Sequence, residues 1–162
     1  ALRDDSRRKW AVEQFARSVL PAPPEEVFDL LSRPDRHRDF DGSGTVQGAR
    51  SEGRRLGLGD TFGMDMHWRV PYATRNVVTE FEEGRRIAWR TLAPTPLTLL
   101  FTGRTWRYEL EPVEGGTRIR ETWDVSTEAL PTRFLLKPLL AEHTRESMER
   151  TLARIEELLR RD

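Results

Sequence analysis

The 162-residue chain has 27 Lys plus Arg against 27 Asp plus Glu, and it contains no cysteine. The zero net charge argues against a generally basic nucleic-acid-binding protein, and the lack of cysteine excludes disulfides, thiolate metal sites and a cysteine nucleophile. No apolar run approaches the length of a membrane span, and residues 1–9 are charged rather than signal-like. We therefore expect a single cytoplasmic domain over residues 1–162, with a flexible segment at residues 1–9 and no stable membrane insertion.

The first part of the chain predicts one strand followed by two short helices. Residues 10–20 favour a strand, because residues 15–19 alternate and β-favouring residues are frequent. Prolines then end this strand, and a helix is expected over residues 24–31, which has proline and two acids in its first turn. Residues 34–40 predict a second short helical turn, and residues 41–44 form a turn cluster.

The middle of the chain predicts about six consecutive antiparallel strands. In the strongest of them, over residues 61–70, an apolar series alternates with a polar one. Pro71 is expected to interrupt the pattern after this strand. The predicted strands are residues 45–49, 61–70, 72–81, 86–91, 102–112 and 117–126.

Two glycine-containing turns predict hairpins whose register decides which side chains share a face. A turn centred on Glu83-Gly84 sets Val78 opposite Trp89 and Asn76 opposite Thr91. A turn centred on Glu114-Gly115 sets Leu110 opposite Ile119, Tyr108 opposite Glu121 and Trp106 opposite Trp123. A slip of one residue would reverse the faces in either hairpin.

The last segment predicts a long amphipathic helix. Its apolar positions recur in steps of three, four or seven, which is the period of one helical face. A long helix is marginal in water on propensity alone, so we expect the sheet to cover this face. Pro138 is expected at the first position of the main helix, with residues 130–137 as a short lead-in. The apolar positions are Leu139, Leu140, Met148, Leu152, Ile155 and Leu159.

This order of elements resembles the START-related (SRPBCC) superfamily, described as polyketide cyclase/dehydrase and lipid-transport proteins. The resemblance runs from about residue 15 to the C-terminus. It implies an α+β helix-grip fold, in which a curved antiparallel sheet of six to seven strands wraps around the C-terminal helix and leaves a cavity. Members bind, transport or transform many different ligands. The segments that carry it are APPEEVF (22–28), PDRH (34–37), FDGSGTV (40–46), GDTFGMDM (59–66), NVVTEFE (76–82), RIAW (86–89) and GTRI (116–119).

The side chains expected on the inner face combine large aromatics with few polar groups. This composition fits either an ordinary core or a small-molecule pocket, because pockets are concave, mostly apolar and carry few polar groups. The candidate ligand-binding residues are Met64, Met66, Trp68, Asn76, Trp89, Trp106, Tyr108, Glu121, Trp123, Met148 and Leu152.

Glu121 lies between Ile119 and Trp123 in the alternation, so its carboxyl group is expected on the apolar side. A buried carboxylate is costly unless it is paired, and burial raises its pKa. Arg104 or the Tyr108 hydroxyl is expected to satisfy it. The group is then either a structural pair or a ligand-orienting or acid/base group, so Glu121, Tyr108 and Arg104 are the catalytic candidates.

The remaining motifs carry weaker predictions. The three histidines lack metal-ligand spacing, so we expect no metal and no other cofactor. Gly42-Ser43-Gly44 is not followed directly by a helix, so it is not a phosphate loop, and Ser43 has no evident partners for a hydrolytic triad. The apolar run of residues 97–101 is either a rim that gates the cavity or a buried strand extension.

These features predict a protein that binds a hydrophobic small molecule, such as a lipid, a polyketide or an isoprenoid, as a monomer or homodimer. An alternative is a polyketide aromatase/cyclase or dehydratase that uses acid/base side chains in the same cavity. A second alternative is a non-catalytic module that dimerises or binds a partner. None of the three predicts a nucleic-acid partner.

Overall fold

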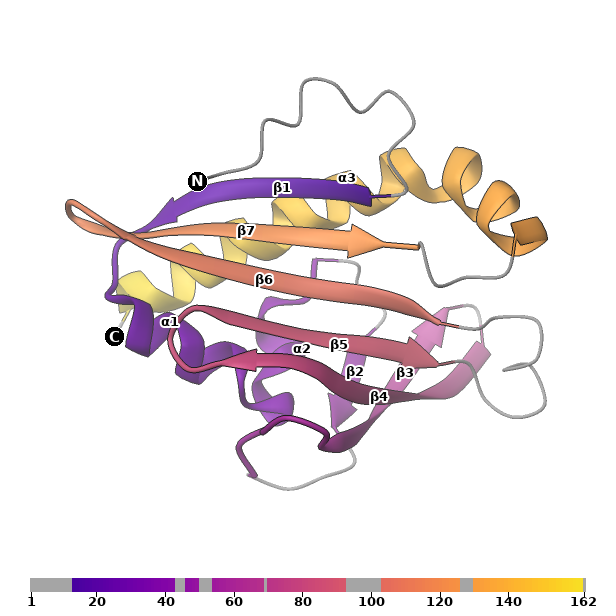
Figure 1. Ribbon diagram of the computed structural model, residues 1–162, viewed down its shortest axis with the longest axis horizontal. Helices are drawn as coiled ribbons and strands as arrows, with labels where there is room; N and C mark the ends of the chain where they lie inside the picture. Colours follow the sequence, from indigo (N-terminus) through magenta and orange to yellow (C-terminus); the bar gives the residue numbers. More distant parts are fainter. Residues whose placement is uncertain are drawn as a thin grey trace.

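A computed structural model describes residues 13–42, 46–49, 54–68, 70–92, 103–125 and 130–161. Within them, seven strands form one antiparallel sheet in the order β1-β7-β6-β5-β4-β3-β2. Figure 1 shows the sheet curving, with the long C-terminal helix behind β1 and β7. The predicted α+β helix-grip fold is confirmed. The elements are β1 (Glu13–Leu20), α1 (Pro24–Leu31), η2 (Pro34–Arg36), α2 (His37–Phe40), β2 (Val46–Ala49), β3 (Thr61–Trp68), β4 (Val70–Glu82), β5 (Arg86–Leu92), β6 (Arg104–Val113), β7 (Gly116–Asp124) and α3 (Leu130–Arg161).

The helix α3 packs its apolar face on the sheet, where it contacts β1 and β7, and it also contacts α2. Met148, Leu152 and Ile155 are buried in the core, as their helical spacing predicts. Burial of each such side chain stabilises the fold by about 1.5–3 kcal/mol. The sheet and the helix therefore depend on each other, since neither can cover its apolar face alone.

The predicted register of the β6–β7 hairpin is confirmed, whereas the β4–β5 turn is one residue longer than predicted. There Glu82 pairs with Arg86, and an irregularity between Val78 and Glu80 restores the predicted pairs beyond it. Val78 pairs with Trp89 across β4 and β5, and Tyr108 pairs with Glu121 across β6 and β7. The two turns place Gly84 at φ 73° and Gly115 at φ 84°. This left-handed conformation is readily adopted by glycine, so these two residues help to fix the register of everything that follows them.

The prediction that Pro71 interrupts the strand pattern is wrong. The break lies earlier, where Trp68 of β3 pairs with Val70 of β4, and Pro71 lies inside β4 opposite His67. Pairing of β4 with β5 begins only at Arg75. Among the described residues, Pro71 therefore has a neighbouring strand on one side only, where the missing N–H of proline is tolerated.

The prediction that Pro138 begins the main helix is also wrong, because α3 is continuous from Leu130 to Arg161. Pro131 occupies the first turn instead, where a proline leaves no helix bond unmade. Pro138 removes one backbone hydrogen bond from the helix interior, a local loss that tends to bend a helix. Figure 1 shows α3 changing direction in its orange, N-terminal part. The predicted strand residues 10–12 and the apolar run 97–101 lie outside the described residues.

Hydrogen bonds at Gly42 connect the segment after α2 to α3. The Gly42 N–H donates a hydrogen bond to Thr151 Oγ1 at 2.8 Å, and Arg150 Nε donates to the Gly42 carbonyl at 2.9 Å. The Arg154 guanidinium donates to the carbonyl of Asp41. These bonds join residues more than 100 positions apart in the chain, and they hold Asp41 beside the C-terminal helix.

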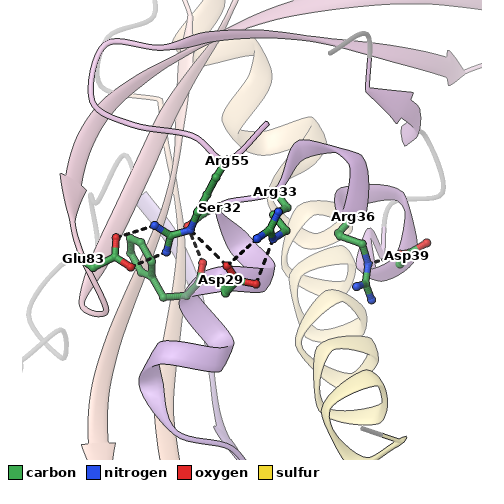
Figure 2. Close-up of polar contacts among 8 residues, drawn as sticks. Asp29, Ser32, Arg33, Arg36, Asp39, Arg55 and Glu83 are labelled. Carbon is green, nitrogen blue, oxygen red and sulfur yellow. Dashed lines mark hydrogen bonds and ion pairs between the residues drawn. The ribbon is translucent and has the colours of Figure 1, made fainter. Parts of the chain in front are cut away.

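A second cluster of polar contacts centres on Arg55, which forms ion pairs with Glu83 and Asp29 (Figure 2). The hydrogen bond to Glu83 raises the pKa of Arg55. The hydrogen bond from Arg33 lowers the pKa of Asp29. The Arg55 guanidinium also lies over the Phe28 ring, 5.6 Å from its centroid. This cluster connects α1 to the hairpin between β4 and β5. Exposed pairs of this kind each contribute at most about 1 kcal/mol.

The close approach at Gly42 generates a stability prediction. A Cβ atom at Gly42 would lie 2.2 Å from the Ser147 carbonyl oxygen and 2.6 Å from the Thr151 amide nitrogen. We expect Gly42→Ala to lower the free energy of unfolding by about 1–3 kcal/mol, because α2 and α3 must separate. Gly57→Ala is the matched control, since its Cβ would meet only Asp60 Oδ2, at 3.5 Å. Denaturant unfolding measures both variants, and equal stabilities would contradict the prediction.

Candidate functional site

The sheet register places most of the predicted aromatic and polar site residues in three parallel rows, each of which crosses four neighbouring strands between β3 and β1. Strand neighbours opposite each other share a face, and every second residue along a strand returns to it. The Trp106–Trp123 row lies between the other two. The rows are Phe62, Asn76, Thr91 and Arg104; Val78, Trp89, Trp106 and Trp123; and Ile87, Tyr108, Glu121 and Ala16.

Glu121 is a buried carboxyl group that hydrogen-bonds on one side only. The Tyr108 hydroxyl donates to Glu121 Oε1 at 2.8 Å. The other oxygen, Oε2, is buried and has no hydrogen-bond partner. The side chain as a whole is 2% exposed. An unpartnered polar atom at this depth is unusual in a folded protein and needs a physical explanation.

Burial is the main cause of an altered protonation state at this pair. Burial raises the pKa of Glu121 to about 8, against the lowering effect of the Tyr108 hydrogen bond, and the charge of Asp41 raises it further. Burial also raises the pKa of Tyr108, with the Glu121 charge as the second cause. Both groups are therefore uncharged at neutral pH. Because Tyr108 donates to Oε1, the carboxyl proton is best placed on Oε2.

An aromatic cluster leads from the short helix α2 to this pair. The His37 ring stacks on Trp89 with centroids 4.9 Å apart, and Phe62 packs edge-on to Trp89 at 5.7 Å. Trp89 in turn lies 5.5 Å from Tyr108. His37 Nε2 lies 2.9 Å from the Leu31 carbonyl oxygen. Burial lowers the pKa of His37 to about 4, so this imidazole is neutral at physiological pH and acts as an aromatic wall.

On β6, burial of the inward side chains decreases toward one end of the rows, although Trp123, opposite Trp106 on β7, is only 1% exposed. On β6, Leu110 and Tyr108 are buried, whereas Trp106 and Arg104 are half-buried. The Trp106 and Trp123 rings lie 6.5 Å apart. The opposite end is covered by α1, which contacts β6 and β7, so within the described residues β6 is more exposed at its Trp106 end. Glu121 lies one row inward from Trp106 and Trp123.

The other predicted site residues fall into three groups. Met64, Met148 and Leu152 are buried in the core, and Met66 packs on it half-buried. Asn76 is also buried, but its amide is used within the sheet. It donates to the Phe62 carbonyl at 3.3 Å and accepts from Thr91 Oγ1 at 2.7 Å. The Trp68 side chain lies outside the described part of the chain.

Arg104, predicted as a possible partner of Glu121, lies in a different row. It pairs with Thr91 and is four residues along β6 from Tyr108, which is about 13 Å of strand. The hydrogen bond to Glu121 comes from Tyr108 instead. Of the two expected partners, the phenol therefore pairs with the carboxyl group, and it does so at Oε1 only.

Two residues near the pair were missed by the sequence reasoning. His37 is buried together with Pro34 and Phe40, and this period of three is the spacing of one face in a tight helical turn. That pattern was available as a signal. Asp41 was assigned only to a turn, and nothing in its sequence context indicates that its charge acts on Glu121 and Tyr108.

Among the residues with described positions, no three His, Asp or Glu side chains are grouped so that they could hold a metal ion. No helix in that part of the chain combines the length and the apolar character that a membrane crossing needs.

The raised pKa of Glu121 predicts how stability depends on pH. Between pH 4.5 and about 8 the native state holds a proton that the unfolded state has lost, so stability falls as pH rises. His37 acts in the opposite direction between pH 6.5 and about 4, so the window from pH 6.5 to 8 isolates Glu121. There we expect the wild type to lose about 1.4 kcal/mol per pH unit relative to Glu121→Gln.

Denaturant unfolding at half-unit pH steps provides the measurement, with Glu114→Gln as the control because Glu114 is exposed in a hairpin turn. Parallel pH profiles for the wild type and Glu121→Gln would show that the Glu121 pKa is not raised.

Comparison with known proteins assigns the chain to a family. The family model for polyketide cyclase/dehydrase and lipid transport matches residues 12–160. Among curated proteins, the uncharacterized protein Rv0088 of Mycobacterium tuberculosis is 34% identical over 114 residues, which are 68% of this chain and 47% of the relative. The chain therefore spans about half the length of the curated relatives it matches.

Solved structures agree on the fold. Protein NE0264 of Nitrosomonas europaea superimposes with a TM-score of 0.68 at 18% identity, covering 92% of this chain and 94% of its own. The di-domain ARO/CYC StfQ from the steffimycin biosynthetic pathway gives a TM-score of 0.58 at 19% identity, covering 91% of this chain and 51% of its own. Because the family model covers nearly the whole chain, this protein belongs to the polyketide cyclase/dehydrase and lipid transport family, and its fold is that of a ligand-binding helix-grip domain.

Proposed function

We propose that this chain binds a hydrophobic small molecule, such as a lipid, a polyketide or an isoprenoid, against the aromatic rows between the sheet and α3. The observation that carries the proposal is the buried, unpartnered Oε2 of Glu121, one row away from the row that holds Trp89, Trp106 and Trp123. Small-molecule sites combine apolar walls with a few placed polar groups. Glu121 and Tyr108 supply the polar groups here.

The burial gradient supports one direction of entry. The half-buried Trp106 and Arg104 mark the more exposed end of β6, and Glu121 lies one row deeper. A ligand that enters past Trp106 meets the indole rings first and the carboxyl group last. In this arrangement the apolar body contacts Trp106 and Trp123 while one polar group reaches Oε2.

A cyclase or dehydratase activity is the second candidate, favoured by the pKa of Glu121 near 8. General acids work best when their pKa lies close to the working pH, and Glu121 is protonated at pH 7 and buried. The family description names both cyclases/dehydrases and lipid transport. In this role Glu121 protonates a carbonyl oxygen of the substrate, and Tyr108 holds the carboxyl group in position.

Ligand binding predicts a change in tryptophan fluorescence. Titration with a panel of lipids, polyketides and isoprenoids is expected to quench the emission and to raise the melting temperature, because the ligand contacts the indole rings and stabilises the folded state. Trp106→Phe is expected to lose a large part of the quenching, whereas it should keep the rise in melting temperature. Native mass spectrometry of freshly purified protein tests the same proposal through a co-purified molecule. A panel without quenching or thermal shift, together with no bound mass, would overturn the proposal.

Glu121→Gln separates a carrier from an enzyme. If Glu121 transfers a proton, the variant should lose about 100-fold or more in kcat with a poly-β-ketone substrate, whereas its affinity should persist. Glu114→Gln is the matched surface control. Turnover by Glu121→Gln at the wild-type rate would remove Glu121 from any mechanism and leave the binding proposal intact.

A further inference from the structure

We propose that Glu121 makes the site selective for ligands whose polar group is a neutral hydrogen-bond acceptor, such as a ketone or ester carbonyl, and that it excludes the corresponding carboxylates. This inference rests on the proposed binding function and adds a rule for the ligand's polar end. It assigns Glu121 Oε2 as the donor to the ligand and Tyr108 as the residue that positions it.

The geometry leaves one oxygen of Glu121 for a ligand. Tyr108 occupies Oε1 through a 2.8 Å hydrogen bond, and Oε2 is buried without a partner. Burial of a polar atom without a hydrogen bond destabilises the folded state, and a ligand group that pairs with it removes this penalty. A carbonyl oxygen that accepts from the Oε2 hydroxyl satisfies it, whereas a hydrocarbon leaves it unpaired.

The surrounding charges disfavour an anionic ligand. The described group whose charge acts on Glu121 is Asp41, which is itself a carboxylate, and this charge supports the protonated state of Glu121. From β6 the neighbour is Tyr108, and from β1 it is Ala16.

The other elements packed around the site present no free cation among the residues that the structure describes. On α3 the side chains are described from Thr144 onward, and the buried polar ones among them are uncharged: Thr144, Ser147 and Thr151. The nearby arginines of that helix are engaged with the carbonyls of Gly42 and Asp41. A ligand carboxylate placed at Oε2 would therefore meet Asp41 and Glu121, whereas Arg104, which shares this face, is four residues along β6 from Tyr108.

A protonated amine would also be attracted to carboxylates, but it would require Glu121 in its charged form. Burial holds the pKa of Glu121 at about 8, so the acid is neutral where an amine ligand is charged. The neutral acceptor is the class that matches the protonated acid. The amine is therefore included below as a competing outcome.

Two series of matched probes test the rule by isothermal titration calorimetry at pH 6.5. The aromatic series is 2-acetylnaphthalene, 2-naphthoate, 1-(2-naphthyl)ethylamine and 2-ethylnaphthalene. The linear series is 2-undecanone, undecanoate, undecylamine and undecane. In at least one series we expect the ketone to bind about tenfold tighter than the hydrocarbon, because it pairs with Oε2. The carboxylate is expected to bind more weakly than the hydrocarbon.

Variants and pH identify the responsible group. The preference for the ketone over the hydrocarbon should disappear as pH rises from 7 to 9, because the ionised Glu121 no longer donates. Glu121→Gln should keep the preference and lose its pH dependence, since an amide donates at every pH. Glu121→Leu should bind ketone and hydrocarbon equally. Tyr108→Phe should keep ketone binding but change the pH dependence of the preference for the ketone over the hydrocarbon. Loss of a residue with a merely structural role would not change that pH dependence.

The possible failures are distinct. A carboxylate or an amine that binds at least as tightly as the ketone would overturn the selectivity rule, as would an unchanged preference in Glu121→Leu. In those cases the hydrocarbon still binds and the proposed function stands. If none of the eight probes binds, with no quenching by the wider ligand panel, the binding function itself fails.

Discussion

The two-residue turn at Glu114-Gly115 is the constraint on which the site depends. It fixes Val113 opposite Gly116 and, from there, every pair back along β6 and β7. With this register, Tyr108 meets Glu121 and the two tryptophans lie side by side on the face toward α3. A slip of one residue would move a carboxyl group and two indole rings to the other face and would bring charged side chains inward. A glycine with φ 84° thus determines which chemistry the interior contains.

The parts of the fold that could be predicted are those governed by local periodicity and turn chemistry. The hairpin pair Trp106–Trp123 and the buried face of α3 follow from alternation, a glycine turn and helical spacing. The pair Val78–Trp89 was also predicted, but it forms only because an irregularity between Val78 and Glu80 offsets a turn that is one residue longer than predicted. The two proline predictions failed because the effect of a proline depends on whether its N–H would have had a partner. At Pro71 the answer depends on which strands lie beside β4. At Pro138 it depends on how far upstream the helix begins.

The candidate site was predictable only in part, because its polar groups are brought together by contacts across the chain. The Tyr108–Glu121 pair was open to prediction, since both residues belong to one hairpin. That Arg104 would not pair with Glu121 was harder to predict. Strand register gives the row of a residue, but a long side chain such as arginine can extend into the neighbouring row. The roles of His37 and Asp41 depend on how the segment after α1 is fastened to α3 through Gly42. That contact spans more than 100 residues and has no local sequence signal.

The opposite pKa shifts of His37 and Glu121 have a joint consequence for the interior. The imidazole stays neutral down to about pH 4, and the carboxylic acid stays neutral up to about pH 8. Over the four pH units between these limits, neither side chain brings a formal charge into the aromatic cluster. Acid introduces a cation beside Trp89, and alkali introduces an anion beside Tyr108. One core is thus vulnerable at both extremes of the pH scale through two different residues: His37, which stacks on Trp89, and Glu121, which hydrogen-bonds to Tyr108.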